Sequence, residues 1–276
     1  MKSKKVATII LNRNLPKITD NLYNHLKKYD GDYTDIFIVE AGSNKKNLSV
    51  NYTWHADWKE ATTKGLRYSR GMNFGLSMLS KENKYKEYDY FFLITNDTIL
   101  RKKKTLLPML ELFDSHERLG ILSPCSAKWG EKDLLKKDKI KYFWFIHNNA
   151  YMISKDFIDC IKSNKRPGYM HFLFDGNNFR GFLAETELIA KAYANDFAAA
   201  ITSEVFAEED ESHLLNNSDL IKTEKYDENL KLYIEEGLTW IKEKYGFSNR
   251  WMMQQHAKNL YDSFFLFFPE YEKYKI

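Results

Sequence analysis

Three runs of mainly apolar residues stand out in the first hundred positions of the chain. They are residues 6–11, 35–39 and 90–94. Each run is nearly continuous and rich in β-branched or aromatic side chains, a pattern typical of strands that are buried on both faces. Helices are expected between them, over residues 19–29 and 65–79, with Thr19 and Asp20 suited to the start of the first helix. This alternation predicts βαβ crossovers and a parallel sheet.

The second half of the chain is less regular. Short strands are expected at residues 120–124 and 144–146, and a helix at residues 185–193. From about residue 218 onward the pattern is helical and amphipathic, with a break at residues 246–249. The pattern predicts one α/β domain, residues 1–215, followed by a helical C-terminal extension, residues 216–276.

A polar cluster follows each of the first three predicted strands. The clusters are residues 12–14, 40–43 and 95–97. Ligands of open α/β sheets bind outside the carboxyl ends of the strands. We therefore expect the three clusters to converge on one crevice.

Charge and composition narrow the class of protein. The net charge is +4, with acidic and basic residues interleaved, which disfavours a dedicated nucleic-acid binder and suits a phosphate-bearing ligand or an anionic membrane surface equally well. Cys125 and Cys160 lack metal-ligand spacing and are expected to be free thiols in a reducing compartment. The run at residues 6–11 is too short for a signal peptide, and no stretch approaches the roughly 20 apolar residues of a membrane span. These features predict a cytoplasmic protein.

Asp97 is the first candidate for chemistry, because it stands at the end of an apolar strand. A carboxylate in that position can hold a hard divalent cation such as Mg²⁺ or Mn²⁺, and the cation can neutralise a diphosphate. The alternative is that Asn96 and Asp97 merely begin a turn, since both residue types favour turns.

Four segments, taken in order, resemble family 2 glycosyltransferases. They are residues 6–14, 36–43, 70–76 and 91–97. The resemblance covers roughly residues 5–210 and implies a GT-A fold: a Rossmann-like, mixed and mainly parallel sheet flanked by helices. It also implies a nucleotide-binding part at about 1–100 and an acceptor-binding part at about 100–215. The expected donor is a nucleoside-diphosphate sugar, and the expected acceptor is a saccharide or a lipid-linked molecule.

The resemblance assigns most of the binding roles by position. Asp57 is added because it lies between the second strand and the Asn73 segment. The residues expected to bind the nucleotide sugar are Asn12, Arg13, Asn14, Glu40, Gly42, Ser43, Asp57, Arg70, Asn73, Asn96 and Asp97. Of the family's Asp-x-Asp metal motif this chain keeps only Asp97. The resemblance implies that a histidine completes the metal site, here His213, although Glu208 falls nearer the expected position; the alternative is a solvated acidic loop.

Glu185 aligns with the family's catalytic base, and Glu187 is the reserve. A base is needed because a sugar hydroxyl is a poor nucleophile until its proton is removed. The alternative is that both glutamates only suit the positive end of a helix dipole. Residues 174–181 form a glycine-bearing loop that can recognise sugar hydroxyls or serve as an irregular connection. The family implies inversion at the anomeric carbon and a role in bacterial surface polysaccharide synthesis.

Two rival functions and three roles for the C-terminal tail stay open. A sugar-phosphate nucleotidyltransferase normally has a glycine-rich loop after its first strand, and residues 12–16 contain no glycine. A catalytically inactive binding or scaffold protein is suggested by the reduced metal motif and by Glu in place of Asp at Glu40 and Glu185. The aromatic tail, residues 251–269, can dock on the catalytic domain, form a homodimer interface, or contact the inner face of a membrane peripherally.

Overall fold

The computed structural model describes residues 5–101, 103–126, 128, 131–146, 149–210, 212, 220 and 223–276. His213 lies outside the described residues, and its role as a metal ligand stays a prediction.

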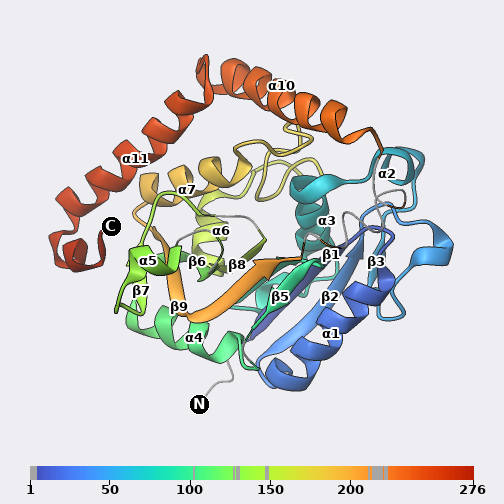
Figure 1. The fold of residues 1–276 in the computed structure, drawn as a ribbon, viewed down its shortest axis with the longest axis horizontal. Coiled ribbons are helices and arrows are strands. Elements are labelled where there is room, and N and C mark those ends of the chain that lie inside the picture. The colour runs from blue at the N-terminus through green and yellow to red at the C-terminus, as the bar shows by residue number, and fades with distance from the viewer. Residues whose placement is uncertain are drawn as a thin grey trace.

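The first hundred residues form the predicted alternation of strands and helices (Figure 1). The elements are β1 (Val6–Asn12), α1 (Pro16–Asp30), β2 (Thr34–Glu40), β3 (Trp54–His55), α2 (Lys59–Lys64), α3 (Arg67–Lys81) and β4 (Tyr90–Thr95). Strands β2 and β4 both pair with β1 in parallel register. The side chains along these strands are mostly buried, as their apolar runs predict.

The second half extends the same sheet and adds antiparallel strands. Its elements are β5 (Thr98–Leu100), α4 (Leu106–Ser115), β6 (Leu119–Cys125), α5 (Glu131–Leu135), β7 (Ile140–Tyr142), β8 (Ala150–Ser154), α6 (Lys155–Ile161), α7 (Ala184–Ala194) and β9 (Ala198–Glu209). The strand order is β3-β2-β1-β4-β8-β6-β9-β5, with β7 on β9. Strand β8 is antiparallel to both β4 and β6, whereas β6 and β9 are parallel. The sheet is therefore mixed, as expected.

Helices cover both faces of the sheet. In Figure 1, α3 and α7 lie on one face, while α1 and α4 lie on the other. The long strand β9 pairs with β6 from Ala198 to Thr202 and again at Phe206, and with β5 at its end. This pairing brings the end of β9 beside the loop that follows β4, where Asp97 lies.

Two helices form an outer layer at the C-terminus: α10 (Tyr226–Tyr245) and α11 (Arg250–Phe267). Helix α11 packs against α7. Its buried side chains include Tyr261, Phe264 and Phe265, which join the main hydrophobic core. Of the three roles predicted for the aromatic tail, docking on the α/β domain is the one that the structure shows.

Two local predictions are wrong. Helix α1 begins at Pro16, whose fixed φ and missing N–H suit a first helical turn. Thr19 therefore lies inside the helix, and its hydroxyl donates to the carbonyl of Leu15 at 2.9 Å. Residues 144–146 form no strand, because β7 (Ile140–Tyr142) makes the pairing with β9 instead. The rings of Phe143, Trp144 and Phe145 pack on one another as the chain leaves the sheet.

Cys125 and Cys160 are both free thiols, as predicted, the first buried and the second exposed. Among the described helices, none is long and apolar enough to pass through a bilayer.

Candidate active site

The loops after β1, β2 and β4 meet through side-chain hydrogen bonds. Asn12 donates from Nδ2 to both carboxylate oxygens of Glu40, at 3.0 and 2.8 Å. Asn96 donates from its own Nδ2 to Asn12 Oδ1 at 2.9 Å. The predicted convergence of the three polar clusters is therefore confirmed.

Glu40 lies at the centre of this network, buried and with its oxygens engaged inside the protein. Besides Asn12, it accepts hydrogen bonds from the hydroxyl of Ser43 and from the backbone N–H of Ser49, the latter at 2.8 Å. A buried carboxylate is tolerated when donors surround it in this way. Glu40 therefore fixes the shape of the loops after β1 and β2, and its contact with a nucleotide stays a prediction.

Asn14 and Gly42 hold these loops in their unusual backbone conformation. Asn14 has a positive φ of 60°, its N–H donates to Ser43 Oγ at 3.0 Å, and its Oδ1 accepts from the N–H of Asn44 at 2.7 Å. Gly42 has a φ of 92°, and a Cβ there would lie 1.8 Å from the carbonyl oxygen of Ala61. Only glycine fits at position 42.

Arg13 and Asp57 lie at the edge of the loop cluster. Arg13 is half-buried and donates to the carbonyl of Thr62 at 3.4 Å. Burial, together with the charge of Arg67 nearby, lowers the pKa of Arg13. Asp57 is exposed on the connection between β3 and α2. The roles predicted for both residues stay predictions.

Arg70 and Asn73, on α3, fasten the loop that leads to α7. Asn73 is buried; its Oδ1 accepts from the backbone N–H groups of Leu173 and Phe174, and its Nδ2 donates to the carbonyl of Phe174. Arg70 donates from Nε to the carbonyl of Gly176 at 2.7 Å. Both side chains are thus committed to positioning residues 173–176, so a direct contact with the nucleotide, as the sequence predicts, stays untested.

Asp97 lies beside the end of β9. Its carbonyl accepts from the backbone N–H of Asp210 at 2.9 Å, next to the pairing of Thr98 with Glu209. Glu208 is buried and forms an ion pair with Arg101 at 2.8 Å. Within the described part of the chain, no group of three His, Cys, Asp or Glu side chains is arranged to hold a metal ion. The described carboxylates therefore do not by themselves fit a complete divalent-cation site.

Glu185 lies in the first turn of α7, near tyrosines from three other elements. Tyr68 of α3, Tyr151 of β8 and Tyr233 of α10 all interact electrostatically with its carboxylate. Glu185 Oε2 and the hydroxyls of Tyr68 and Tyr151 are shielded from solvent and have no hydrogen-bond partner among the described residues. Buried polar groups are nearly always hydrogen-bonded, so this group can receive a polar ligand.

Burial also sets the protonation behaviour of Glu185. It raises the pKa of the carboxyl to about 7, because desolvation favours the neutral form. A general base is most effective when its pKa lies near the operating pH. The surroundings of Glu185 thus suit a group that takes a proton from a ligand hydroxyl near neutral pH.

Glu187 has different surroundings. Its carboxylate is buried, accepts from the hydroxyl of Tyr245, and forms ion pairs with Lys244 at 2.8 Å and Lys191 at 3.2 Å. Lys244 and Tyr245 hold it against the end of α10, while Lys191 lies one turn along on α7 itself. Glu187 therefore links α7 to the C-terminal extension.

Several residues near Glu185 carry no local sequence signal. Tyr68, Tyr151 and Tyr233 come from separate elements and look like ordinary aromatic positions in the sequence. Arg67 and Arg180 both form an ion pair with Glu224 although they stand far apart in the chain. Arg180 belongs to the loop of residues 174–181 that the sequence marks as a candidate. For the three tyrosines, the only indication in the sequence is the helical spacing that places Tyr68 on α3.

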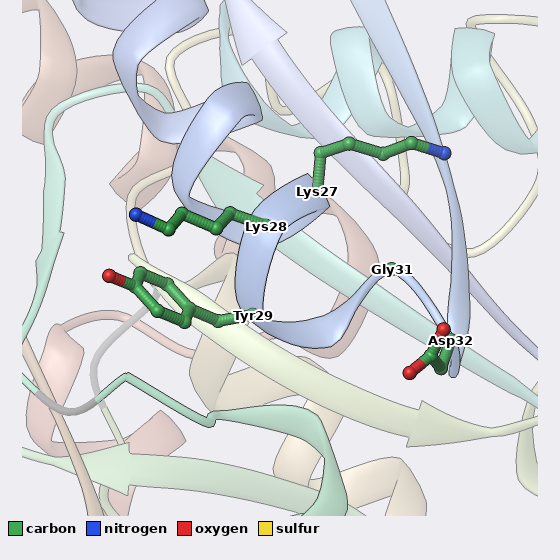
Figure 2. Close-up of a pocket in the computed structure, with 5 residues that line it drawn as sticks. All are labelled: Lys27, Lys28, Tyr29, Gly31 and Asp32. Atoms are coloured by element: carbon green, nitrogen blue, oxygen red, sulfur yellow. The ribbon is translucent and has the colours of Figure 1, made fainter.

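A small pocket lies away from this region, at the C-terminal end of α1. Figure 2 shows its lining residues: Lys27, Lys28, Tyr29, Gly31 and Asp32. It sits where the chain enters β2, whereas the loops described above follow the ends of the strands. It contains none of the predicted site residues.

The fold matches that of known sugar transferases. No protein-family model and no curated protein matches the sequence. Among solved structures, the chain is similar to the mannosyltransferase PcManGT of Pyrobaculum calidifontis, described in complex with GDP-Man and Mn²⁺, with a TM-score of 0.54, 9% identity, and coverage of 94% of this chain and 74% of that one. It is also similar to S. aureus TarS, with a TM-score of 0.51, 14% identity, and coverage of 86% of this chain and 43% of that one.

At these identities the similarity shows the fold alone, which is the GT-A fold of glycosyltransferases. The fold class expected from the sequence is confirmed.

Proposed function

We propose that this protein is a glycosyltransferase that moves a sugar from a nucleotide-sugar donor to a hydroxyl group of an acceptor. The observation that carries the proposal is the position of Glu185 at the start of α7, with a pKa of about 7 and a carboxylate oxygen that has no hydrogen-bond partner among the described residues. The GT-A fold supports the same conclusion by analogy, since a fold alone does not define a reaction.

The proposed reaction inverts the anomeric carbon. The nucleoside binds at the loops after β1, β2 and β4, which Glu40 holds in shape. Glu185 takes the proton from the acceptor hydroxyl as its oxygen attacks the anomeric carbon. The bond between that carbon and the diphosphate oxygen breaks, and the nucleoside diphosphate leaves with the electron pair. Tyr68 and Tyr151 are placed to donate hydrogen bonds to the sugar or the acceptor.

The acceptor class follows from the same proposal. A saccharide or lipid-linked acceptor of bacterial surface polysaccharide synthesis suits a transferase of this fold, by analogy only. A divalent cation at Asp97 stays a prediction, since the described residues supply this carboxylate without a full ligand set. No step of the proposed reaction is assigned to the cation.

The test is an assay of nucleoside diphosphate release from a panel of UDP- and GDP-sugars, with simple saccharides as acceptors. We expect one donor to be turned over by the wild type and by the Glu235→Gln control, which changes an exposed residue of α10. Glu185→Gln is expected to bind that donor and to lose turnover. Donor binding without turnover by the wild type, on any acceptor, would instead favour the scaffold function.

A further inference from the structure

Two arginines from distant parts of the chain share one carboxylate. Arg67 stands at the start of α3, and Arg180 lies in the loop before α7. Arg67 Nη2 donates to Glu224 Oε2 at 3.0 Å, and Arg180 Nη2 donates to Glu224 Oε1 at 2.7 Å. Arg180 Nη1 is also paired with Glu236 of α10. Glu224 thus bridges the two guanidinium groups as a single anion.

The two guanidinium groups are held close together around one aromatic ring. The Cζ atoms of Arg67 and Arg180 lie 5.7 and 5.4 Å from the centroid of the Phe179 ring. Arg180 is the more buried, with 6% of its side chain exposed. Arg67 Nε is also buried and makes no hydrogen bond to any residue that the structure describes. Like charges brought together in this way require an anion between them.

The pair lies near the loop after β1, at one end of the proposed reaction site. Burial lowers the pKa of Arg13, in the loop after β1, and the nearby charge of Arg67 lowers it further, whereas that of Glu224 raises it. Arg180 is followed after one turn by α7 and Glu185. The pair therefore lies beside the loop after β1 and includes a residue of the segment that leads into α7.

Guanidinium groups are well suited to the central part of such a ligand. An arginine presents a planar fork of N–H donors that matches the oxygens of a phosphate, and paired arginines can neutralise two negative charges. A carboxylate that bridges two arginines resembles a phosphate group, because both are anions and their oxygens are similarly spaced.

We propose that Arg67 and Arg180 bind the diphosphate of the nucleotide donor, and that Glu224 occupies this anion site when the donor is absent. The inference rests on the proposed function, because it assigns the diphosphate of that donor to named residues. It also makes Glu224 a competitor of the donor as well as a link between α10 and the catalytic part.

Calorimetric titration of UDP and GDP, and of uridine and guanosine as phosphate-free probes, tests the proposal. We expect Arg67→Gln and Arg180→Gln each to weaken binding of the preferred nucleoside diphosphate by about tenfold or more, with little change for the nucleoside. Glu224→Gln is expected to tighten binding severalfold because the competing charge is gone. Arg166→Gln and Glu228→Gln, which change exposed residues, serve as matched controls, and thermal unfolding reports whether each variant is folded.

The outcomes separate the inference from the proposed function. If the ion pairs only anchor α10, all three variants have a lower melting temperature and bind the nucleoside diphosphate as the wild type does. That result overturns the inference and leaves the proposed function intact. The Glu224→Gln variant is decisive here, since anchoring predicts lower stability with no gain in affinity. If the wild type binds no nucleoside diphosphate, the proposed function fails and the inference fails with it.

Discussion

Glu185 and Glu187 stand two residues apart on the first turn of α7, and their carboxylates lie in opposite electrostatic surroundings. Glu185 lies among the tyrosine side chains of α3, β8 and α10, where burial raises its pKa to about 7. Glu187 is held by the positive charges of Lys191 and Lys244. On a helix, residues two positions apart point to different sides. The surroundings of Glu185 therefore suit proton transfer, whereas those of Glu187 suit a structural ion pair.

The first prediction separates these two roles by substitution. Glu185→Gln is expected to lower kcat for sugar transfer by about 10²- to 10⁴-fold, the usual contribution of a general base. Glu187→Gln is expected to retain most of the activity and to lose roughly 1–3 kcal/mol of unfolding free energy, as expected when charged hydrogen bonds are weakened. Steady-state kinetics and urea unfolding check the pair. Equal kinetic losses in both variants would contradict the assignment.

The second prediction concerns pH. A base must be unprotonated, so kcat is expected to rise with pH through an apparent pKa near 7. For stability the sign is opposite: the folded state holds the Glu185 proton more tightly than the unfolded state does. The unfolding free energy therefore falls as pH rises from about 4.5 to about 7 and levels off above that range.

A comparison of the wild type with Glu185→Gln at pH 5 and pH 8 isolates this effect. The variant removes a buried charge at the higher pH, so it is expected to be stabilised there by roughly 1–3 kcal/mol, with little change at pH 5. Urea unfolding at both pH values is the measurement. A variant that is destabilised equally at both values would show that Glu185 is not buried as a titrating group.

The pattern of apolar residues predicted most of the sheet, and the reason is burial. The strands β1, β2 and β4 are covered by helices on both sides, so their sequences are almost continuously apolar. The same pattern wrongly predicted a strand that begins at Trp144. A short aromatic run is also found where side chains pack on one another outside a sheet. The convergence of Asn12, Glu40 and Asn96 was predictable because it follows from strand direction alone.

The surroundings of Glu185 could not be predicted in the same way. Tyr68, Tyr151 and Tyr233 meet it only through the packing of α3, β8 and α10, and no spacing in the sequence relates their positions. The pairing of Glu187 with Lys244 is equally remote, since it depends on how α10 ends beside α7. Long-range contacts of this kind are set by tertiary structure.

The third prediction concerns Glu40 as the centre of the loop network. Glu40→Ala leaves the buried donors of Asn12, Ser43 and Ser49 without their acceptor. We expect a loss of roughly 3–5 kcal/mol in unfolding free energy, together with weaker nucleoside diphosphate binding. Urea unfolding checks the first effect, and Glu87→Ala at an exposed position is the control. Unchanged stability would mean that the network does not hold the loops.

The fourth prediction concerns the docking of the aromatic tail. Phe264 is buried against Tyr142 and Tyr193, whereas Leu266 two residues later is 81% exposed. Phe264→Ala is therefore expected to cost about 3–5 kcal/mol, while Leu266→Ala changes stability by at most about 0.5 kcal/mol. Thermal and urea unfolding of the two variants decide this. Similar values for both would show that α11 is not part of the core.

The last prediction concerns the cation at Asp97, and it bears on how the charge of the diphosphate is balanced. Asp97 accepts a backbone hydrogen bond from Asp210, and the diphosphate of the donor can supply further ligands to a cation bound there. If a cation binds at Asp97, Mn²⁺ is expected to strengthen nucleoside diphosphate binding by the wild type about tenfold or more. Asp97→Asn is expected to abolish this increase in affinity. Asp32→Asn, at an exposed position in the pocket of Figure 2, is the control. Equal binding by the wild type with and without Mn²⁺ would show the cation prediction to be wrong, and the arginine pair would then carry the diphosphate charge alone.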